Sequence, residues 1–245
     1  MDAQPLPWRE ATIREIRPET PRAKTLVLDV SGWPGHAAGQ HVDVRLTAED
    51  GYEAQRSYSI ASGPGSADLE LTVEGIADGE VSPYLTEEAR PGDAFELRGP
   101  IGGYFVWDPA APDPLLLVGG GSGLVPLMAM LRNRRAAGSA VDARLLLSAP
   151  TLDDVLYRSE LERLAADSVQ VRITLTRGPA PAGWDGFARR IDRDMLLAVG
   201  PAPSLRPRVY VCGPTPFVEE AARLLVELGH EPAGVHTERF GPTGG

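Results

Sequence analysis

The chain has 245 residues, of which 42% are hydrophobic and 24% are charged, and these ordinary globular proportions exclude a disordered or collagen-like protein. Its formal net charge of −10 argues against nucleic acid as a partner, because such binding depends on Lys and Arg that neutralise phosphates. The single cysteine, Cys212, excludes an intrachain disulfide, a plant-type iron–sulfur cluster and a cysteine-rich zinc site.

The sequence also lacks the signals of a metal site, a covalent hydrolase, a secreted protein and a membrane span. The histidines have no metal-ligand spacing, and no Gly-x-Ser-x-Gly elbow occurs. The N-terminal segment has no basic start followed by an apolar run. The longest uncharged stretch, from Pro114 to Arg132, contains glycines and Pro126 and predicts a strand, a turn and a helix. We therefore expect a cytoplasmic protein with no metal and no membrane partner.

The first hundred residues alternate between apolar and polar side chains, which is typical of half-buried strands. Clusters of Gly and Pro separate the alternating runs. Several short strands at this spacing predict a small antiparallel barrel, closed or nearly closed. The runs lie around residues 11–16, 25–30, 42–46, 69–73 and 95–97.

Near Asp108 the pattern changes. The segment from Asp108 to Pro114 contains three prolines and predicts a stiff linker, since each proline fixes φ and removes a backbone donor. Apolar runs without alternation then predict strands covered on both faces, as in a parallel sheet, at residues 115–118, 145–147 and 209–211. Helical periodicity occupies residues 152–164 and 218–228, the second stopped by Gly229.

Strands and helices in alternation predict a doubly wound α/β domain with a parallel sheet. The fold class is thus two-domain. We expect an antiparallel β-barrel over residues 1–108 and an α/β domain over residues 114–245.

A glycine-rich segment, Gly119 to Pro126, follows an apolar strand and opens a helix. Glycines let the backbone approach a pyrophosphate, and the helix N-terminus offers free N–H groups and a positive dipole end. Pro126 stands where the usual dinucleotide fingerprint has its third glycine. A turn that binds nothing therefore remains the alternative interpretation.

Three shorter segments are further candidates. Arg56-Ser57-Tyr58-Ser59 combines a phosphate-pairing Arg, a ring that can stack and a hydroxyl that can donate. In Gly79-Glu80-Val81-Ser82-Pro83, Ser82 is a good N-cap and Pro83 a good first helical residue. Cys212-Gly213-Pro214 ends a buried strand at the edge where α/β folds hold ligands. Taken alone, the three segments are better explained as an ordinary strand, a capped surface helix and a packed cysteine. Residues 236–240 alternate like a strand, and Glu238 among them fits a solvated carboxylate at a sheet edge.

The order of these segments along the chain is more specific than any one of them. From about Trp8 to Phe240, the series resembles the ferredoxin–NADP reductase superfamily. The segments that carry the resemblance are 56–59, 79–82, 99–103, 119–126, 212–214 and 238–240.

The resemblance implies that the barrel holds FAD. Arg56 then contacts the flavin phosphates, Tyr58 packs on the isoalloxazine ring, and Ser59 hydrogen-bonds near flavin N5. A helix start with unpaired amides suits the FAD pyrophosphate. The other flavin contacts implied are Ser57 in the same motif, Gly79, Val81 and Ser82 at the pyrophosphate, and Thr72, Val73 and Glu74 along the adenine-side or ribityl path.

The resemblance also implies that the α/β domain holds NADPH or NADH. Cys212 then lies beside the nicotinamide ring, and Glu238 and Phe240 approach the flavin and nicotinamide from the chain's end. Residues 241–245 follow Phe240, whereas photosynthetic reductases end on an aromatic residue, so a different cover of the flavin ring is expected. The remaining contacts implied are Gly120, Gly121, Ser122 and Gly123 at the dinucleotide, Gly213 and Pro214 beside Cys212, and Thr176 and Arg177 at a 2′-phosphate.

The function implied is an FAD-dependent NAD(P)H oxidoreductase with Ser59, Cys212 and Glu238 at the reacting rings. Electrons pass to a separate acceptor, a ferredoxin-like protein or an oxygenase component. Arg177 favours NADPH, whereas Asp153 and Asp154 oppose the extra phosphate. A free-flavin reductase and a non-catalytic flavin- or nucleotide-binding subunit are the alternatives, and we expect a monomer.

Overall fold

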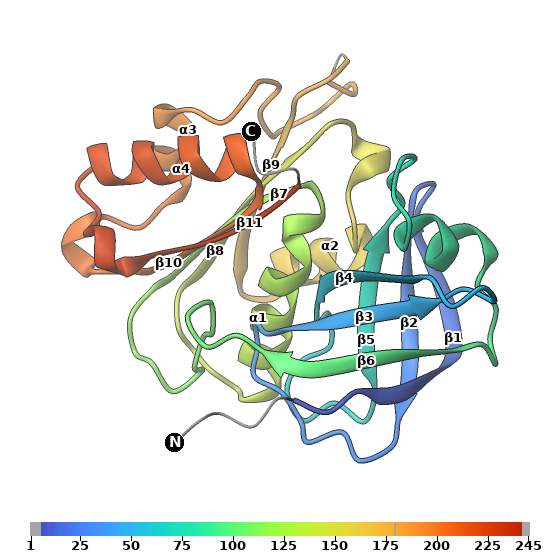
Figure 1. Ribbon diagram of the computed structural model, residues 1–245. Helices are drawn as coiled ribbons and strands as arrows, with labels where there is room; N and C mark the ends of the chain where they lie inside the picture. The colour runs from blue at the N-terminus through green and yellow to red at the C-terminus, as the bar shows by residue number, and fades with distance from the viewer. Residues whose placement is uncertain (1–5, 179, 242–245) are drawn as a thin grey trace. The chain divides into compact units, whose positions relative to one another are not determined.

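The computed structural model describes residues 6–178 and 180–241 (Figure 1). Residues 1–5, 179 and 242–245 are outside the described residues. The predicted start of the first domain, the predicted end of the second domain and the tail beyond Gly241 therefore lie outside them. The chain divides into two compact units. The first runs to Trp107 and takes in Met128–Asn133, and the second holds Asp108–Leu127 and the chain from Arg134 onward. The sequence contained no signal that 128–133 groups with the first unit, and the bounds 1–108 and 114–245 stay a prediction.

The first unit contains a six-stranded antiparallel sheet in the order β4-β3-β6-β1-β2-β5. Side chains of alternate residues fill its core, as the period-two pattern predicted. The strands are β1 (Arg9–Thr20), β2 (Ala23–Val30), β3 (His41–Thr47), β4 (Glu53–Ser59), β5 (Leu69–Glu74) and β6 (Ala94–Ile101).

The sheet is barrel-like but not fully closed. The edge strands β4 and β5 are joined beyond the end of β4 by a single antiparallel bridge, Ile60 to Leu71, and the amide of Ala61 donates to Glu70 O at 2.8 Å. Of the two forms that the alternation predicted, the nearly closed one is therefore correct. A short helical segment, η1 (Tyr84–Glu88), buries Leu85 in the core of this unit.

The second unit contains a five-stranded parallel sheet in the order β11-β10-β7-β8-β9, with helices around it (Figure 1). Every residue of β7 is buried, as its unbroken apolar run predicted, so the doubly wound α/β prediction is confirmed. The strands are β7 (Leu115–Gly120), β8 (Ala143–Ala149), β9 (Val169–Leu175), β10 (Arg208–Pro214) and β11 (Val235–Phe240), and the helices are α1 (Leu124–Ala136), α2 (Arg158–Asp167), α3 (Arg193–Val199) and α4 (Thr215–Glu227). Of α1, both ends belong to this unit and residues Met128–Asn133 to the first.

The helix predicted from residue 152 begins later than its periodicity suggested. Residues Leu152–Asp154 form a separate 3₁₀ turn, η3, and α2 starts at Arg158. Thr151 and Asp154 close η3 with a reciprocal capping box, and Tyr157 then takes a left-handed conformation with φ of 53°. Leu152 in η3 is half-buried, whereas Val155 and Leu156 after it and Leu161 and Leu164 in α2 are buried, so the apolar spacing continues across two separate elements.

Within the described ranges, no helix is both long enough and apolar enough to cross a membrane.

Candidate functional site

The carboxyl ends of β7 and β10 meet where the order of the parallel sheet reverses. The chain runs outward through β7, β8 and β9 and then returns to the other side of β7 with β10 and β11. Ligands of open α/β sheets bind in the crevice at such a reversal. Gly119 is in register with Cys212, and Cys212 with Glu238. Three segments singled out from the sequence are therefore neighbours at this edge.

The glycine-rich segment turns from β7 through a 3₁₀ turn, η2 (Gly121–Gly123), into α1. Gly121 has φ of +55°, and a Cβ built there meets nothing within 4 Å, so this part of the turn faces open space. A Cβ on Gly123, by contrast, lies 2.2 Å from the carbonyl oxygen of Cys212. The first turn of α1 has no acidic side chain, which leaves its N–H groups suited to an anion.

The ring of Phe217 on α4 leaves no room for a side chain at Gly120, the last residue of β7. A Cβ on Gly120 would lie 2.8 Å from the Phe217 ring, and so would a Cβ on Gly213. The ring therefore packs on the backbone of both strand ends. This residue was missed in the sequence because it lies just before the periodic apolar positions of α4, and only its packing reveals it. The predicted residues Gly120, Gly121, Ser122 and Gly123 come together in this one turn, with Cys212 and Gly213 against them.

Cys212 and Glu238 lie side by side on β10 and β11. The Cys212 side chain is 2% exposed. Burial, together with the nearby Glu238 carboxylate, raises the pKa of the Cys212 thiol well above its ordinary value, so the thiol is protonated at neutral pH and is no nucleophile. Burial raises the pKa of Glu238 to about 7. Glu238 is thus half-buried, contrary to the solvated interpretation, and it titrates where a group can both hold and release a proton.

The last residues of the two strands remain accessible. Pro214 and Phe240 are in register at the ends of β10 and β11, and both are exposed. The predicted residues of the chain's end are therefore at the same edge of the sheet as the glycine turn.

Thr176 and Arg177 follow β9, two strands away from β7. Their amides donate to the carbonyl oxygens of Ala149, at 3.0 Å, and Pro150, at 2.8 Å, which leaves the Arg177 side chain exposed beyond the sheet. Asp154 accepts from Thr151 N at 3.1 Å and from Thr151 Oγ1 at 2.7 Å. Its carboxylate therefore caps η3.

The four side chains of the Arg56–Ser59 motif in β4 differ in their contacts and exposure. Ser57 donates to Asp43 Oδ1 at 2.6 Å, across to β3. Tyr58 is half-buried against the barrel core, and burial raises the pKa of its hydroxyl. Ser59 is half-buried and Arg56 is exposed. The strand thus presents a guanidinium, a ring and a hydroxyl in succession.

The turn that follows β5 differs from its prediction in one detail. Ser82 does not cap the short helix, because its Oγ accepts from the amide of Ile76 at 3.1 Å. The tight turn from Ile76 to Gly79 brings that amide within reach. Val81 is fully buried. Within the described part of the chain, the backbone N–H groups of Glu80 and Val81 donate to no protein atom, so they are available to an anion.

The residues expected along the adenine-side or ribityl path take part in the barrel itself. Thr72 Oγ1 lies 2.7 Å from Thr25 Oγ1, and Val73 is in the core. Glu74 pairs with Arg22 at 3.2 Å. Their predicted contacts with a flavin stay a prediction.

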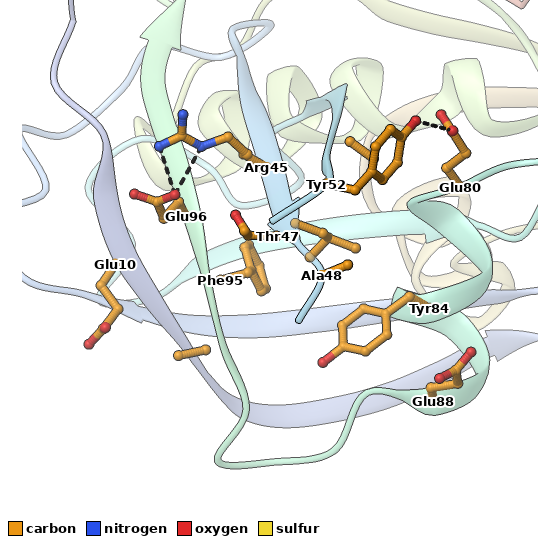
Figure 2. A pocket seen from close by; sticks show the side chains of 13 residues that line it. Glu10, Arg45, Thr47, Ala48, Tyr52, Glu80, Tyr84, Glu88, Phe95 and Glu96 are labelled. Atoms are coloured by element: carbon orange, nitrogen blue, oxygen red, sulfur yellow. Dashed lines mark hydrogen bonds and ion pairs between the residues drawn. The ribbon is translucent and has the colours of Figure 1, made fainter. Parts of the chain in front are cut away.

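A pocket of about 530 Å³ opens beside the turn 76–82, which contributes Glu80 to its wall (Figure 2). Residues of β3, β6 and η1 and of the hairpin before β4 also line it. On one side Tyr52 Oη donates to Glu80 Oε1 at 2.5 Å, and on the other Arg45 binds Glu96 at 2.7 Å (Figure 2). The second carboxylate oxygen of Glu80 lies 3.0 Å from a guanidinium nitrogen of Arg56. The sequence contained no signal for the role of Tyr52, because it lies in a loop of no recognisable pattern.

Comparisons with known proteins agree with this geometry. The chain matches an oxidoreductase FAD-binding domain over residues 24–106 and an oxidoreductase NAD-binding domain over residues 117–223. It is 36% identical to a ferredoxin–NADP reductase B of Sorangium cellulosum, over 94% of this chain and 97% of that protein. It is 31% identical to the glycine betaine monooxygenase reductase subunit of Pseudomonas aeruginosa, over 84% of this chain but only 56% of that subunit. The FAD/NAD-binding domain of a Vibrio cholerae nitric oxide dioxygenase shares the fold, with a TM-score of 0.84 over 96% of this chain and 99% of that one at 23% identity.

Fold, site and relatives define an oxidoreductase that uses FAD and a nicotinamide dinucleotide. The chain belongs to the ferredoxin–NADP reductase superfamily, as the order of its motifs indicated. It is an NAD(P)H-dependent FAD oxidoreductase that passes electrons to a redox partner.

The residues present fit both cofactors. The exposed guanidinium of Arg56 and the available amides of Glu80 and Val81 suit a diphosphate. The open side of Gly121 and the N-terminus of α1 suit a dinucleotide. Among the described residues, no group of three or more His, Cys, Asp or Glu side chains could hold a metal ion.

Proposed function

We propose that this chain is a reductase in which the motif of β4 and the turn 79–82 hold FAD, and the carboxyl edge of the parallel sheet holds NADPH or NADH. Its acceptor is a small redox protein or an oxygenase component. The observation that carries the proposal is the junction of the glycine turn, Cys212 and Glu238 at the reversal of strand order, where α/β sheets bind ligands.

On the flavin side, each residue has a defined task in the proposal. Arg56 and the amides of Glu80 and Val81 bind the diphosphate, with Gly79 and Ser82 shaping the turn. Ser57 holds β4 to β3 through Asp43. The other residues proposed here are Tyr58 packed on the flavin ring, Ser59 donating near its N5, and Thr72, Val73 and Glu74 along the adenine-side or ribityl path.

On the nicotinamide side, the proposed residues position the nicotinamide ring and keep water away from it. When bound, FAD supplies the redox chemistry, because it accepts a hydride from a nicotinamide and can return electrons singly. Cys212 presents a small, protonated thiol that lets a ring approach closely. Glu238 holds or releases a proton near pH 7. Phe240, Gly213 and Pro214 exclude water from the same edge, and residues 120–123 bind the dinucleotide.

The choice of donor rests on Arg177. Its exposed guanidinium, with Thr176 beside it, suits the 2′-phosphate of NADPH. Asp154 caps η3, so its charge is tied to that turn, and Asp153 remains the exposed carboxylate that opposes a phosphate. We propose NADPH as the preferred donor and expect Arg177→Gln to raise the KM for NADPH about tenfold while leaving that for NADH unchanged.

A visible absorption spectrum of the purified protein, followed by anaerobic addition of NADPH and separately of NADH, tests the proposal. We expect flavin bands that remain through gel filtration and bleach rapidly, faster with NADPH. Loss of the flavin on the column would favour a free-flavin reductase, and bands that persist with both donors would favour a non-catalytic subunit. The same column tests the expected monomer, and cell fractionation tests the expected cytoplasmic location.

A further inference from the structure

Three side chains of the first unit form a chain of contacts beside the proposed diphosphate site. Glu80 accepts from Tyr52 Oη with one carboxylate oxygen, at 2.5 Å, and lies 3.0 Å from Arg56 Nη2 with the other. Arg56 Nη1 donates to the carbonyl oxygen of Gln55 at 2.7 Å. Both terminal nitrogens of the guanidinium are therefore engaged within the protein, one of them by a carboxylate.

The carboxylate of Glu80 keeps its charge at neutral pH. The hydrogen bond from Tyr52 is the main cause that holds the pKa of Glu80 below its ordinary value, and Arg56 adds to it. Tyr52, Arg56 and Glu80 are all exposed, so the contacts can be exchanged for others without disturbing the core.

We propose that Glu80 competes with the FAD diphosphate for Arg56 and thereby sets how tightly the chain retains FAD. The inference rests on the proposed role of Arg56. A diphosphate that reaches Arg56 meets a negative charge 3.0 Å from the same guanidinium, so binding must displace Glu80 or tolerate its repulsion. Tyr52 keeps that charge directed at Arg56.

The same turn supplies both attraction and repulsion. The backbone amides of Glu80 and Val81 favour an anion, whereas the Glu80 side chain opposes one. Glu80→Gln removes the charge and keeps the size and the backbone. Since exposed ion pairs are weak, we expect the Kd for FAD to fall about two- to fivefold, less at high salt where such interactions are screened.

The experiment is a fluorescence titration of the deflavinated 245-residue chain with FAD and, separately, with riboflavin, which carries no phosphate. Glu80→Gln is compared with wild type and with Glu88→Gln, which removes an exposed charge from another wall of the same pocket. We expect tighter FAD binding for Glu80→Gln alone and no change for riboflavin. A thermal melt of each variant confirms folding.

Arg56→Gln separates failure of this inference from failure of the proposed function. If Arg56→Gln weakens FAD binding but Glu80→Gln leaves it unchanged or weakens it, Arg56 binds the diphosphate and the competition is wrong. If Arg56→Gln leaves FAD binding unchanged, the proposed role of Arg56 is wrong and the inference falls with it. An equal gain for riboflavin or for Glu88→Gln would also overturn the competition.

Discussion

Glu238 is a carboxyl group whose protonation changes near neutral pH because the fold buries it. Its pKa in the folded chain is about 7, above its ordinary value of 4.5. Below pH 4.5 the group is protonated in both the folded and the unfolded state, so burial costs nothing. As the pH rises through 7, the folded state must bury a charge that the unfolded state exposes to water, and stability is lost.

We therefore expect Glu238→Gln to stabilise the protein at pH 8 but not at pH 5. The gain at pH 8 is about 1–2 kcal/mol, because part of the side chain still reaches water. Thermal unfolding from pH 5 to pH 8 measures it, with Glu219→Gln on the exposed face of α4 as a control. Parallel curves for wild type and Glu238→Gln would contradict the raised pKa.

Cys212 gives a second prediction for a single residue. Since the thiol is buried and protonated, its proposed contribution is that of a small, polarisable side chain against the ring, and Cys212→Ser should leave FAD bound while slowing hydride transfer about tenfold. Anaerobic single-turnover reduction by NADPH gives the rate, and the flavin absorbance of the purified variant gives the occupancy. An unchanged rate would show that Cys212 does not contribute to hydride transfer.

At the level of elements, two glycines of the turn between β7 and α1 have different roles: Gly123 is required for packing, whereas Gly121 faces the proposed dinucleotide site. Gly123→Ala places a Cβ 2.2 Å from the Cys212 carbonyl oxygen and 2.7 Å from Gly213 N, both backbone atoms that cannot rotate away. Helix α1 and strand β10 must then separate, at a cost of about 3 kcal/mol or more. Gly121→Ala meets open space and pays only for its positive φ, about 1 kcal/mol.

Urea unfolding of the two variants tests this difference. Gly121→Ala should remain folded with bound FAD but show a raised KM for NADPH, because its methyl group points to the proposed dinucleotide site. If Gly123→Ala proved as stable as Gly121→Ala, the close approach of the turn to β10 would be wrong.

Element boundaries show where periodicity is insufficient. Most strands follow from alternation or from unbroken apolar runs, but β9 was not predicted and β4 was noticed only through its motif. Helix α4 ends near Gly229, as expected. The start of α2 does not follow, because a capping box and a left-handed Tyr157 interrupt the chain without interrupting its apolar spacing. Ser82 likewise has the identity of an N-cap, but the turn at Ile76 offers its hydroxyl a nearer donor.

At the scale of the whole molecule, the net charge of −10 predicts how ionic strength affects electron transfer to small acceptors. An anionic acceptor is repelled and a cationic one is attracted, and salt screens both effects. Steady-state oxidation of NADPH should thus quicken with salt when ferricyanide is the acceptor and slow with salt when hexaammineruthenium(III) is used. The same salt response with both acceptors would show that local charges at the flavin outweigh the total.

Local patterns in the sequence were enough to predict an antiparallel and a parallel sheet, the α/β class of the second domain and the family, because periodicity and the order of short motifs can be read along the chain. Contacts between distant segments could not be predicted in this way, because they depend on how the strands pair. Cys212 and Glu238 become a pair because β10 and β11 are parallel and in register, and burial then moves the pKa of Glu238 to about 7. Glu80 meets Arg56 because the turn after β5 lies beside β4, and two opposite charges 24 positions apart in the sequence attract only once the fold brings them within 3.0 Å.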